Sequence, residues 1–395
     1  MPESSRGGLE RRDFLIGSLA TAGASAALSA AASAAKAQGA KPAAASGGTV
    51  FTGDTLQGKP VISALNLEDL EPGRHRFYFR GVQTVTGQHR HVSVTVLKGA
   101  RPGKRALLTS GVHGDEISPI RTIQIVLDQL DPMEMSGSVI AAFDISGPAL
   151  EGMARRWPNS GRGIDLIDMN REWPGDANGF SAPSRHAALL FDRLFQPNAD
   201  FAIDFHSVAT GMDGTAFHLA DLSRPEVAEM AMLYPIDQIF DSTGGYDGIL
   251  TNELTAAGIP AFTPEIGRPR ILDLAMIPLF VEGTMNVLKH HGVIAGPMGR
   301  TGRESGVFVG NSGFPIVATH GGLVELLVGP RDSVKSGQRV AVQYDMFGDL
   351  VAEYASAVDG QVMACRTDAT CEPGTTLMVV LFQAEAAGME TVYPE

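Results

Sequence analysis

Short apolar runs alternate with longer stretches of helical periodicity through the middle of this 395-residue chain, and that alternation constrains its fold most. The apolar runs have the length of buried strands and lie at residues 106–110, 139–145, 201–205, 216–220 and 261–266. Stretches with a helical spacing of apolar residues lie at residues 117–130, 184–195, 246–257 and 272–290. Strands and helices that alternate over about 200 residues predict an α/β fold, with a mixed sheet flanked by helices.

The two ends of this region have different patterns. Residues from 60 to 100 alternate between polar and apolar positions, which predicts antiparallel strands joined by a turn near Gly87. Helical spacing stops near Gly296, and short strands punctuated by glycine follow it. We therefore expect a main domain at residues 49–295 and a small C-terminal all-β domain, of the barrel-sandwich type, at residues 296–395.

The C-terminal domain resembles the biotinyl/lipoyl-like fold. A carrier domain of that kind needs a lysine at the tip of a hairpin, and no lysine occurs between Arg339 and Arg366. We therefore interpret this domain as a structural appendage.

The N-terminal segment has the pattern of an export signal. Arg11 and Arg12 precede an apolar run rich in alanine, serine and glycine, which ends in the small-x-small triplet Ala35-Lys36-Ala37. This resembles a twin-arginine signal, with residues 1–37 as the signal and residues 38–48 as a linker. A membrane anchor is the alternative, but a run of this composition is marginal for staying in lipid. We expect export by the twin-arginine translocon to the periplasm, with no stable membrane insertion after cleavage.

Charge and cysteine content exclude several classes of function. The chain has 31 basic and 44 acidic residues, a formal net charge of −13, which argues against nucleic acid or an anionic membrane as a partner. Two cysteines are too few for a disulfide-built scaffold or a thiolate zinc cluster. In the periplasm, Cys365 and Cys371 either pair with each other or remain thiols, and the sequence leaves both alternatives open.

His113 and Glu116 lie directly after the apolar run at residues 106–110, where a strand gives way to a helix. Side chains three residues apart at such a point project to the same side and can share one cation. Zinc accepts nitrogen and oxygen ligands, and α/β sheets bind ligands at the carboxyl ends of their strands. This pair is therefore a candidate for two of three metal ligands.

His206 is the candidate for the third ligand, because it follows the apolar run at residues 201–205. Asp204, two residues earlier, is a candidate acceptor for the N–H of its ring. The alternative is an ordinary hydrogen-bonded histidine at the end of a strand. Two strand ends that carry the same chemistry favour the metal site, with His218 as the substitute ligand.

Asn170 and Arg171 offer an amide and a guanidinium side by side, which suits two-point binding of a carboxylate. Arg155 and Arg156 add positive charge upstream in an otherwise acidic chain. Such a cluster either binds an anionic substrate or forms structural ion pairs with nearby aspartates such as Asp168. Next to a metal site, the substrate role is favoured.

Glu265 is an isolated acid in an otherwise apolar strand. Burial there raises the pKa of a carboxyl group, which suits a general base that must take a proton from water on a metal. The alternative is a salt bridge with Arg268 or Arg270 at the end of the strand. Alongside the other residues, we favour the catalytic role.

Taken in chain order, this set resembles the succinylglutamate desuccinylase/aspartoacylase family, a branch of the zinc carboxypeptidase (M14-like) superfamily. The resemblance spans residues 104–290, and the glycine-punctuated β tail is similar to that of deacylase-like members. It implies a zinc-carboxypeptidase-like catalytic domain. The motif residues that carry the resemblance are His113, Glu116, Asn170, Arg171, His206 and Glu265.

The resemblance implies a role for each of these positions. The two histidines and Glu116 would bind one Zn²⁺ ion, the Asn-Arg pair would bind the substrate carboxylate, and Glu265 would act as general base and acid. An upstream arginine, Arg155 or Arg156, would help to polarise the scissile carbonyl, and we favour Arg156 for that role and leave Arg155 for substrate binding. Tyr246 lies where carboxypeptidase-like relatives have a mobile tyrosine.

We therefore expect a zinc-dependent hydrolase that cleaves an amide bond in a small molecule or short peptide with a free carboxylate, such as an N-acyl amino acid. A periplasmic zinc carboxypeptidase acting on peptides is the first alternative, and an esterase is chemically possible at the same site. A non-catalytic binding protein is disfavoured, because all three ligands and the acid are present.

Overall fold

The computed structural model describes residues 47–159 and 165–384. The expected export signal and most of the expected linker lie outside these ranges. Within them, no helix has the length and apolar character that a membrane crossing requires.

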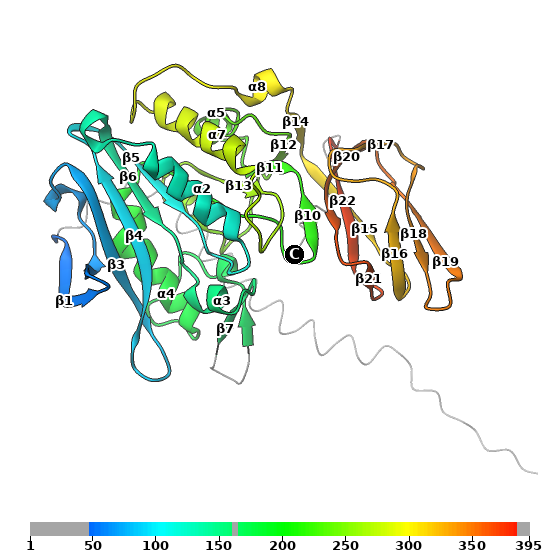
Figure 1. Ribbon diagram of the computed structural model, residues 1–395, viewed down its shortest axis with the longest axis horizontal. Coiled ribbons are helices and arrows are strands. Elements are labelled where there is room, and N and C mark those ends of the chain that lie inside the picture. The colour runs from blue at the N-terminus through cyan, green and yellow to red at the C-terminus, as the bar shows by residue number, and fades with distance from the viewer. Residues whose placement is uncertain (1–46, 160–164, 385–395) are drawn as a thin grey trace, which may run out of the picture. The chain divides into compact units, whose positions relative to one another are not determined.

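The main domain is built on an 11-stranded sheet in which parallel and antiparallel pairs are mixed (Figure 1). In spatial order its strands are β1 (Val50–Leu56), β2 (Lys59–Ala64), β3 (Gly73–Gln83), β4 (His89–Lys98), β6 (Ser136–Ala142), β5 (Arg101–Thr109), β9 (Phe201–Asp204), β13 (Ala261–Ile266), β11 (Ala216–Ala220), β12 (Gln238–Asp241) and β14 (Phe308–Gly310). Strands β3 and β4 pair antiparallel across the turn at Gly87, as their alternating pattern predicts.

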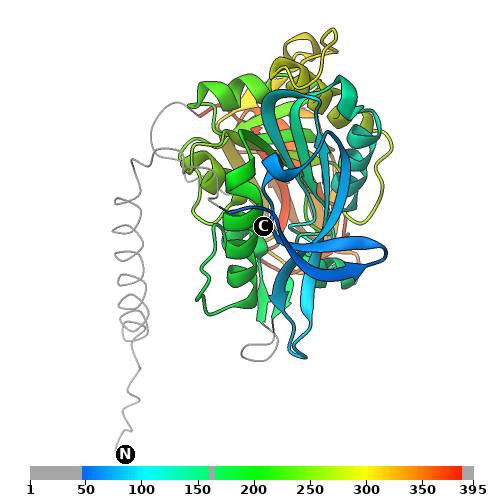
Figure 2. The ribbon, with the colours of Figure 1, turned by 90° about the vertical axis from the view of Figure 1, so that its left-hand side faces the viewer.

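Helices cover both faces of this sheet, because successive strand residues point to opposite faces. Leu108 packs into the core that is shared with α2 (Ile117–Asp128), α5 (Pro225–Ala231) and α7 (Ile277–His290). Its neighbour Leu107 packs into the other core, with α4 (Ala182–Leu190) and α6 (Leu250–Ala256). Figure 1 shows α2 and α7 in front of the sheet and α4 behind it, and in Figure 2 the sheet runs between the two helical layers. This arrangement confirms the predicted α/β fold.

Shorter elements complete the main domain. They are the helices α3 (Gly147–Glu151) and α8 (Gly302–Ser305) and the two-stranded ribbon of β7 (Trp157–Asn159) and β8 (Asp165–Ile167). Helix α7 begins later than the predicted start at residue 272, because Pro278 occupies its first turn and residues 267–276 form a loop.

The C-terminal region forms two small antiparallel sheets with a core between them. One contains β15 (Ser312–Val317), β17 (Ser333–Val334), β20 (Gly360–Arg366) and β22 (Thr376–Phe382), joined by β10 (Met212–Gly214) from the main domain. The other contains β16 (Gly322–Leu326), β18 (Arg339–Tyr344), β19 (Leu350–Ala355) and β21 (Thr370–Cys371). Since β14 still pairs with β12 in the large sheet, the strands of the small sheets begin at Ser312.

Both cysteines lie in the C-terminal region as buried free thiols. Burial raises the pKa of the Cys365 thiol to about 11, so the thiol stays protonated at neutral pH. Gln343 donates a hydrogen bond to the sulfur of Cys371 at 3.3 Å.

Candidate metal centre and active site

Three adjacent parallel strands end at the same edge of the large sheet, and the predicted site residues lie at that edge. Strand β5 pairs with β9, and β9 pairs with β13. His113 and Glu116 follow β5, and His206 follows β9. Glu265 lies next to the end of β13, where it forms a backbone bridge with His206. The strand order therefore brings together residues that are more than 150 positions apart in the chain.

His113, Glu116 and His206 each turn one ligand atom toward a common point, and these atoms all lie within 4.8 Å of one another. Glu116 Oε1 is 2.7 Å from Nδ1 of His113, and its Oε2 is 2.9 Å from Nδ1 of His206. The two Nδ1 atoms are 3.1 Å apart. All three side chains are buried, with 1–2% of their surface exposed. The predicted ligand set therefore converges.

The outer nitrogen of each histidine faces a carboxylate. His113 Nε2 lies 3.0 Å from Asp168 Oδ1, and His206 Nε2 lies 2.7 Å from Asp204 Oδ2. A carboxylate accepts a hydrogen bond, so each carboxylate holds a proton on Nε2 of its histidine and leaves Nδ1 to face inward as the ligand atom.

Nδ1 of each histidine and the carboxylate of Glu116 face one another at the centre of the site, an arrangement that a positive charge between them would stabilise. Burial by itself lowers the pKa of His206, but Asp204 and Glu116 raise it well above its ordinary value. Burial likewise raises the pKa of Glu116, while His113 and His206 hold it well below its usual range. The donor set, two nitrogens and a carboxylate in a buried site, fits a divalent cation and matches the ligands that catalytic zinc sites use.

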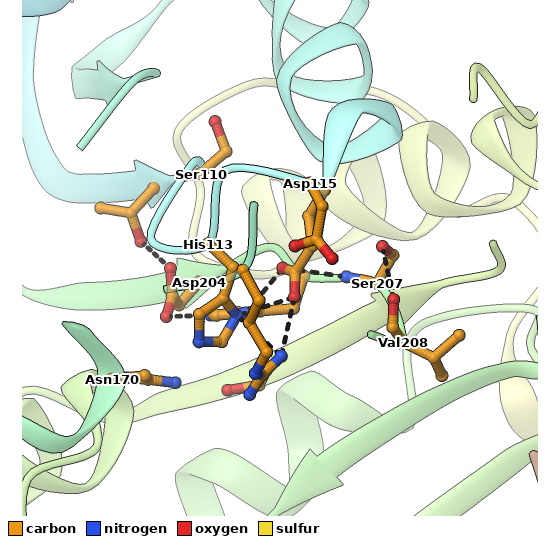
Figure 3. A network of polar contacts seen from close by, with 12 residues as sticks. Ser110, His113, Asp115, Asn170, Asp204, Ser207 and Val208 are labelled. Atoms are coloured by element: carbon orange, nitrogen blue, oxygen red, sulfur yellow. Dashed lines mark hydrogen bonds and ion pairs between the residues drawn. The ribbon is translucent and has the colours of Figure 1, made fainter. Parts of the chain in front are cut away.

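Neighbouring polar groups fix the positions of the carboxylates. The backbone N–H of Ser207 donates to Glu116 Oε2 at 3.2 Å. The hydroxyl of Thr109 donates to Asp204 Oδ1 at 2.6 Å. Figure 3 shows Asp204 and Ser207 on either side of His113, joined to the network by dashed lines. Asp204 thus contacts His206 as the sequence suggests, because residues two apart at the end of a strand share a side.

Asp168 has a role that sequence reasoning missed. Its Oδ1 accepts from His113 and also from the backbone N–H of Asn170 at 2.9 Å, and its Oδ2 lies 3.5 Å from Nη2 of Arg155. The sequence suggested only the ion pair with an arginine. The available signal was the Asp-x-Asn spacing, in which an aspartate accepts from the backbone two residues on and so has a fixed orientation.

The two upstream arginines differ in whether they contact the predicted ligands. Arg155 Nη1 lies 3.3 Å from Glu116 Oε1 and 3.2 Å from Nδ1 of His113. Burial lowers the pKa of Arg155, but Glu116 and Asp168 outweigh this and raise it, so its charge is secure. Arg156, the next residue in the same bend, is exposed. The geometry therefore favours Arg155 over Arg156 for contact with a substrate carbonyl.

The predicted carboxylate-binding pair lies beside this cluster. Asn170 is buried, and its Oδ1 accepts from the backbone N–H of Leu250 at 3.0 Å. That bond fixes the amide plane, so the NH₂ group is left to donate on the side of the histidines, as Figure 3 shows. Arg171 is exposed, and its guanidinium donates to the Asn170 carbonyl at 3.0 Å. The pair therefore presents donors at the open side of the site.

Tyr246 lies in a glycine-rich loop that packs against Arg171, and 43% of its surface is exposed. Gly248, in the same loop, has a φ of +86°, and a Cβ there would lie 2.5 Å from the carbonyl oxygen of Arg171. The positive φ and the short distance to that oxygen both require glycine at this position. The loop that carries Tyr246 is thus held against the backbone of Arg171.

Glu265 faces the metal ligands from β13. Its Oε2 is buried and has no hydrogen-bond partner among the described residues. Burial raises its pKa to about 8, with Glu116 adding to the rise and His206 and Arg155 opposing it. The alternative salt bridges are directed elsewhere: Arg268 lies 3.9 Å from Asp213, and Arg270 donates to the Met153 carbonyl.

His218, the substitute ligand, is in the core and not at the site. It is fully buried, with its ring 4.6 Å from that of Tyr234 and 4.9 Å from that of Phe262. Burial lowers its pKa to about 3, so it remains neutral.

Comparison with known proteins agrees with this geometry. The succinylglutamate desuccinylase/aspartoacylase catalytic domain matches residues 102–291. N-alpha-acetyl-L-2,4-diaminobutyric acid deacetylase of Halomonas elongata is 27% identical over 317 residues, which is 75% of this chain and 87% of that protein.

Solved structures show the same fold. A succinylglutamate desuccinylase/aspartoacylase from Rhodobacter sphaeroides superposes with a TM-score of 0.70 at 24% identity, over 81% of this chain and 98% of that one. The product-bound ectoine utilization protein EutE (DoeB) from Ruegeria pomeroyi has a TM-score of 0.71 at 20% identity, over 80% of this chain and 97% of that one. With the matched catalytic domain and the converged site residues, residues 102–291 belong to the succinylglutamate desuccinylase/aspartoacylase catalytic-domain family, and the chain is similar to an amide-bond deacylase.

Proposed function

We propose that this protein is a zinc-dependent deacylase that hydrolyses the amide bond of an N-acyl amino acid or a similar small molecule with a free carboxylate. The observation that carries this proposal is the convergence of His113, Glu116 and His206 opposite Glu265, whose Oε2 has no hydrogen-bond partner among the described residues. The relationship to a deacetylase of an N-acetylated amino acid supports the substrate class.

Two nitrogens and a carboxylate would hold the ion: Nδ1 of His113, Nδ1 of His206 and the carboxylate of Glu116. When bound, a zinc ion supplies Lewis acidity, which polarises the amide carbonyl and lowers the pKa of water. The protein's own contribution to this step is the fixed orientation of the two imidazoles by Asp168 and Asp204.

Glu265 moves the protons of the reaction. Its buried Oε2 faces the ligand cluster without a hydrogen-bond partner among the described residues, and its pKa is raised to about 8 by burial. A carboxylate with a raised pKa takes a proton from the attacking water and returns it to the leaving nitrogen. Amide hydrolysis needs that second transfer, because an amine is a poor leaving group until it is protonated.

Arg155, Asn170 and Arg171 bind and orient the substrate. Arg155 carries its charge 3.3 Å from Glu116, where it would stabilise negative charge that develops on the carbonyl oxygen. Asn170 and Arg171 hold the free carboxylate, which places the scissile amide next to Glu265.

Location is a further part of the proposal. The paired arginines and the small-x-small triplet that ends at Ala37 support export to the periplasm by the twin-arginine route. Intact-mass measurement of the protein from the periplasmic fraction would find a chain that begins at residue 38, whereas a full-length cytoplasmic chain would contradict this.

A substrate panel tests the function. The purified, zinc-loaded protein is assayed with N-acetyl and N-succinyl amino acids, the same compounds with the carboxylate converted to an amide, short peptides and simple esters. We expect release of free amino acid from the carboxylate compounds, with loss of turnover after chelation. Hydrolysis of peptides alone would favour a carboxypeptidase, and binding without any hydrolysis would overturn the proposal.

A further inference from the structure

Three segments of the chain that contain or adjoin residues of the proposed reaction contact one another. The first is the turn from His113 to Glu116, the second is residues 153–155, which end in Arg155, and the third is the loop 267–271 that follows Glu265. The relative placement of the ligands, the arginine and the base depends on how these three segments are held together.

Arg270 contacts the other two segments at once. Its backbone N–H donates to the carbonyl oxygen of Asp115, in the first segment, at 2.7 Å. Its guanidinium Nη2 donates to the carbonyl oxygen of Met153, in the second segment, at 2.9 Å. The backbone N–H of Gly114, in the first segment, donates to the carbonyl oxygen of Ala154, in the second segment, at 3.0 Å. Each of the three segments is therefore bonded to the other two.

The backbone at both ends of the Arg270–Met153 bond is in the left-handed region. Arg270 has a φ of +60° and Met153 a φ of +46°, and in the described chain only two other non-glycine residues, Gln57 and Arg331, have a positive φ. Residues other than glycine pay a steric cost there and persist in it only when the surroundings hold them. A glycine would adopt the conformation of residue 270 with less strain but would lose the guanidinium.

We infer that Arg270 is a positioning residue of the proposed reaction. It clamps the 153–155 segment against the His113–Glu116 turn, and in this way fixes Arg155 relative to the metal ligands. This inference rests on the proposed function for its effect on turnover, whereas the clamp itself is a property of the chain that can be measured without a substrate.

The test compares Arg270→Gly with Arg270→Lys and with Arg268→Met. Arg268→Met is the matched control, because it removes a guanidinium from the same loop whose ion-pair partner is Asp213. For Arg270→Gly we expect kcat to fall about tenfold to a hundredfold, with KM changed by less than about twofold, because Arg155 acts on charge that develops in the transition state. Arg270→Lys keeps one donor for the Met153 carbonyl and should recover most of that loss.

Two further measurements test whether Arg270 holds the 153–155 segment in place, and neither depends on turnover. Hydrogen exchange of peptides that cover residues 150–157 should speed up in Arg270→Gly and stay as in the wild type in Arg268→Met. The melting temperature of Arg270→Gly should be unchanged or higher, since glycine relieves the strain at a φ of +60°.

Unchanged exchange in residues 150–157, or unchanged kcat in an active enzyme, would overturn the inference. A loss of activity that parallels a lower melting temperature and is not restored by lysine would also overturn it, by assigning Arg270 to stability alone. If the wild type hydrolyses none of the panel substrates, the proposed function fails, and the exchange comparison still decides whether the clamp exists.

Discussion

Replacing Asp168 with asparagine should weaken metal binding without disturbing the ligand atoms themselves. Asp168 is the carboxylate behind His113: its Oδ1 accepts from the ring Nε2 at 3.0 Å and from the backbone of Asn170 at 2.9 Å. Burial raises the pKa of Asp168, but His113, Arg155 and Arg171 hold it well below its usual range, so the group is charged at neutral pH.

An asparagine at this position keeps the size of the side chain and loses its charge. If its oxygen faces His113, its NH₂ group is turned toward the guanidinium of Arg155, and two donors then meet. If the amide is reversed, its NH₂ group meets the Nε2–H of His113 instead. In both cases the imidazole is a weaker base at Nδ1. Loss of such an outer partner costs about 10- to 100-fold in metal affinity, which corresponds to about 1 to 3 kcal/mol.

The assay is a competition titration of zinc between the protein and a coloured chelator at pH 7. Asp165→Asn is the matched control, because Asp165 is an exposed carboxylate three residues earlier in β8. We expect Asp168→Asn to bind zinc about 10- to 100-fold more weakly and Asp165→Asn to bind as the wild type does. An affinity for Asp168→Asn within twofold of the wild type would refute the role given to this carboxylate.

Three further predictions concern the base, the substrate and pH. Glu265→Gln should keep its zinc and lose about 10²- to 10⁴-fold in kcat, and full turnover would exclude Glu265 as the base. Arg171→Ala should raise KM about tenfold or more for carboxylate substrates and leave their amide-capped forms unaffected, so identical kinetics on both would exclude the carboxylate contact. His186 is fully buried, and burial lowers its pKa to about 4 from an ordinary 6.5. Between these values His186 holds a proton in the unfolded chain that it lacks in the folded chain, so its own contribution to the free energy of unfolding should fall by about 3 kcal/mol as pH drops from 6.5 to 4. Denaturant titrations of the wild type and His186→Gln would measure this, and equal pH slopes would show that His186 is not the source.

Much of the fold follows from local pattern, because a buried strand and an amphipathic helix each need a distinct spacing of apolar residues. The five predicted apolar strands are present as β5, β6, β9, β11 and β13. Pairings between distant segments produce no comparable pattern of apolar residues in the sequence. The pairing of Met212 in β10 with Arg366 in β20 joins the main domain to a C-terminal sheet, and neither segment's periodicity indicates it.

The candidate site was predictable to the extent that strand ends determine it. His113, Glu116 and His206 each follow an apolar strand, and parallel strands bring their carboxyl ends to one edge. The choice between Arg155 and Arg156 was not predictable, because it depends on which side of an irregular segment faces the ligands. The contact between Arg270 and Met153 likewise depends on the path of two loops.

The account depends most on whether one divalent ion binds between two imidazoles and a carboxylate. Anomalous diffraction at the zinc absorption edge, from crystals of the zinc-loaded protein, tests this directly. We predict one peak per chain, about 2.0–2.2 Å from Nδ1 of His113, Nδ1 of His206 and an oxygen of Glu116. A zinc-loaded crystal with no peak at that position, or with its peak on other residues, would contradict the account.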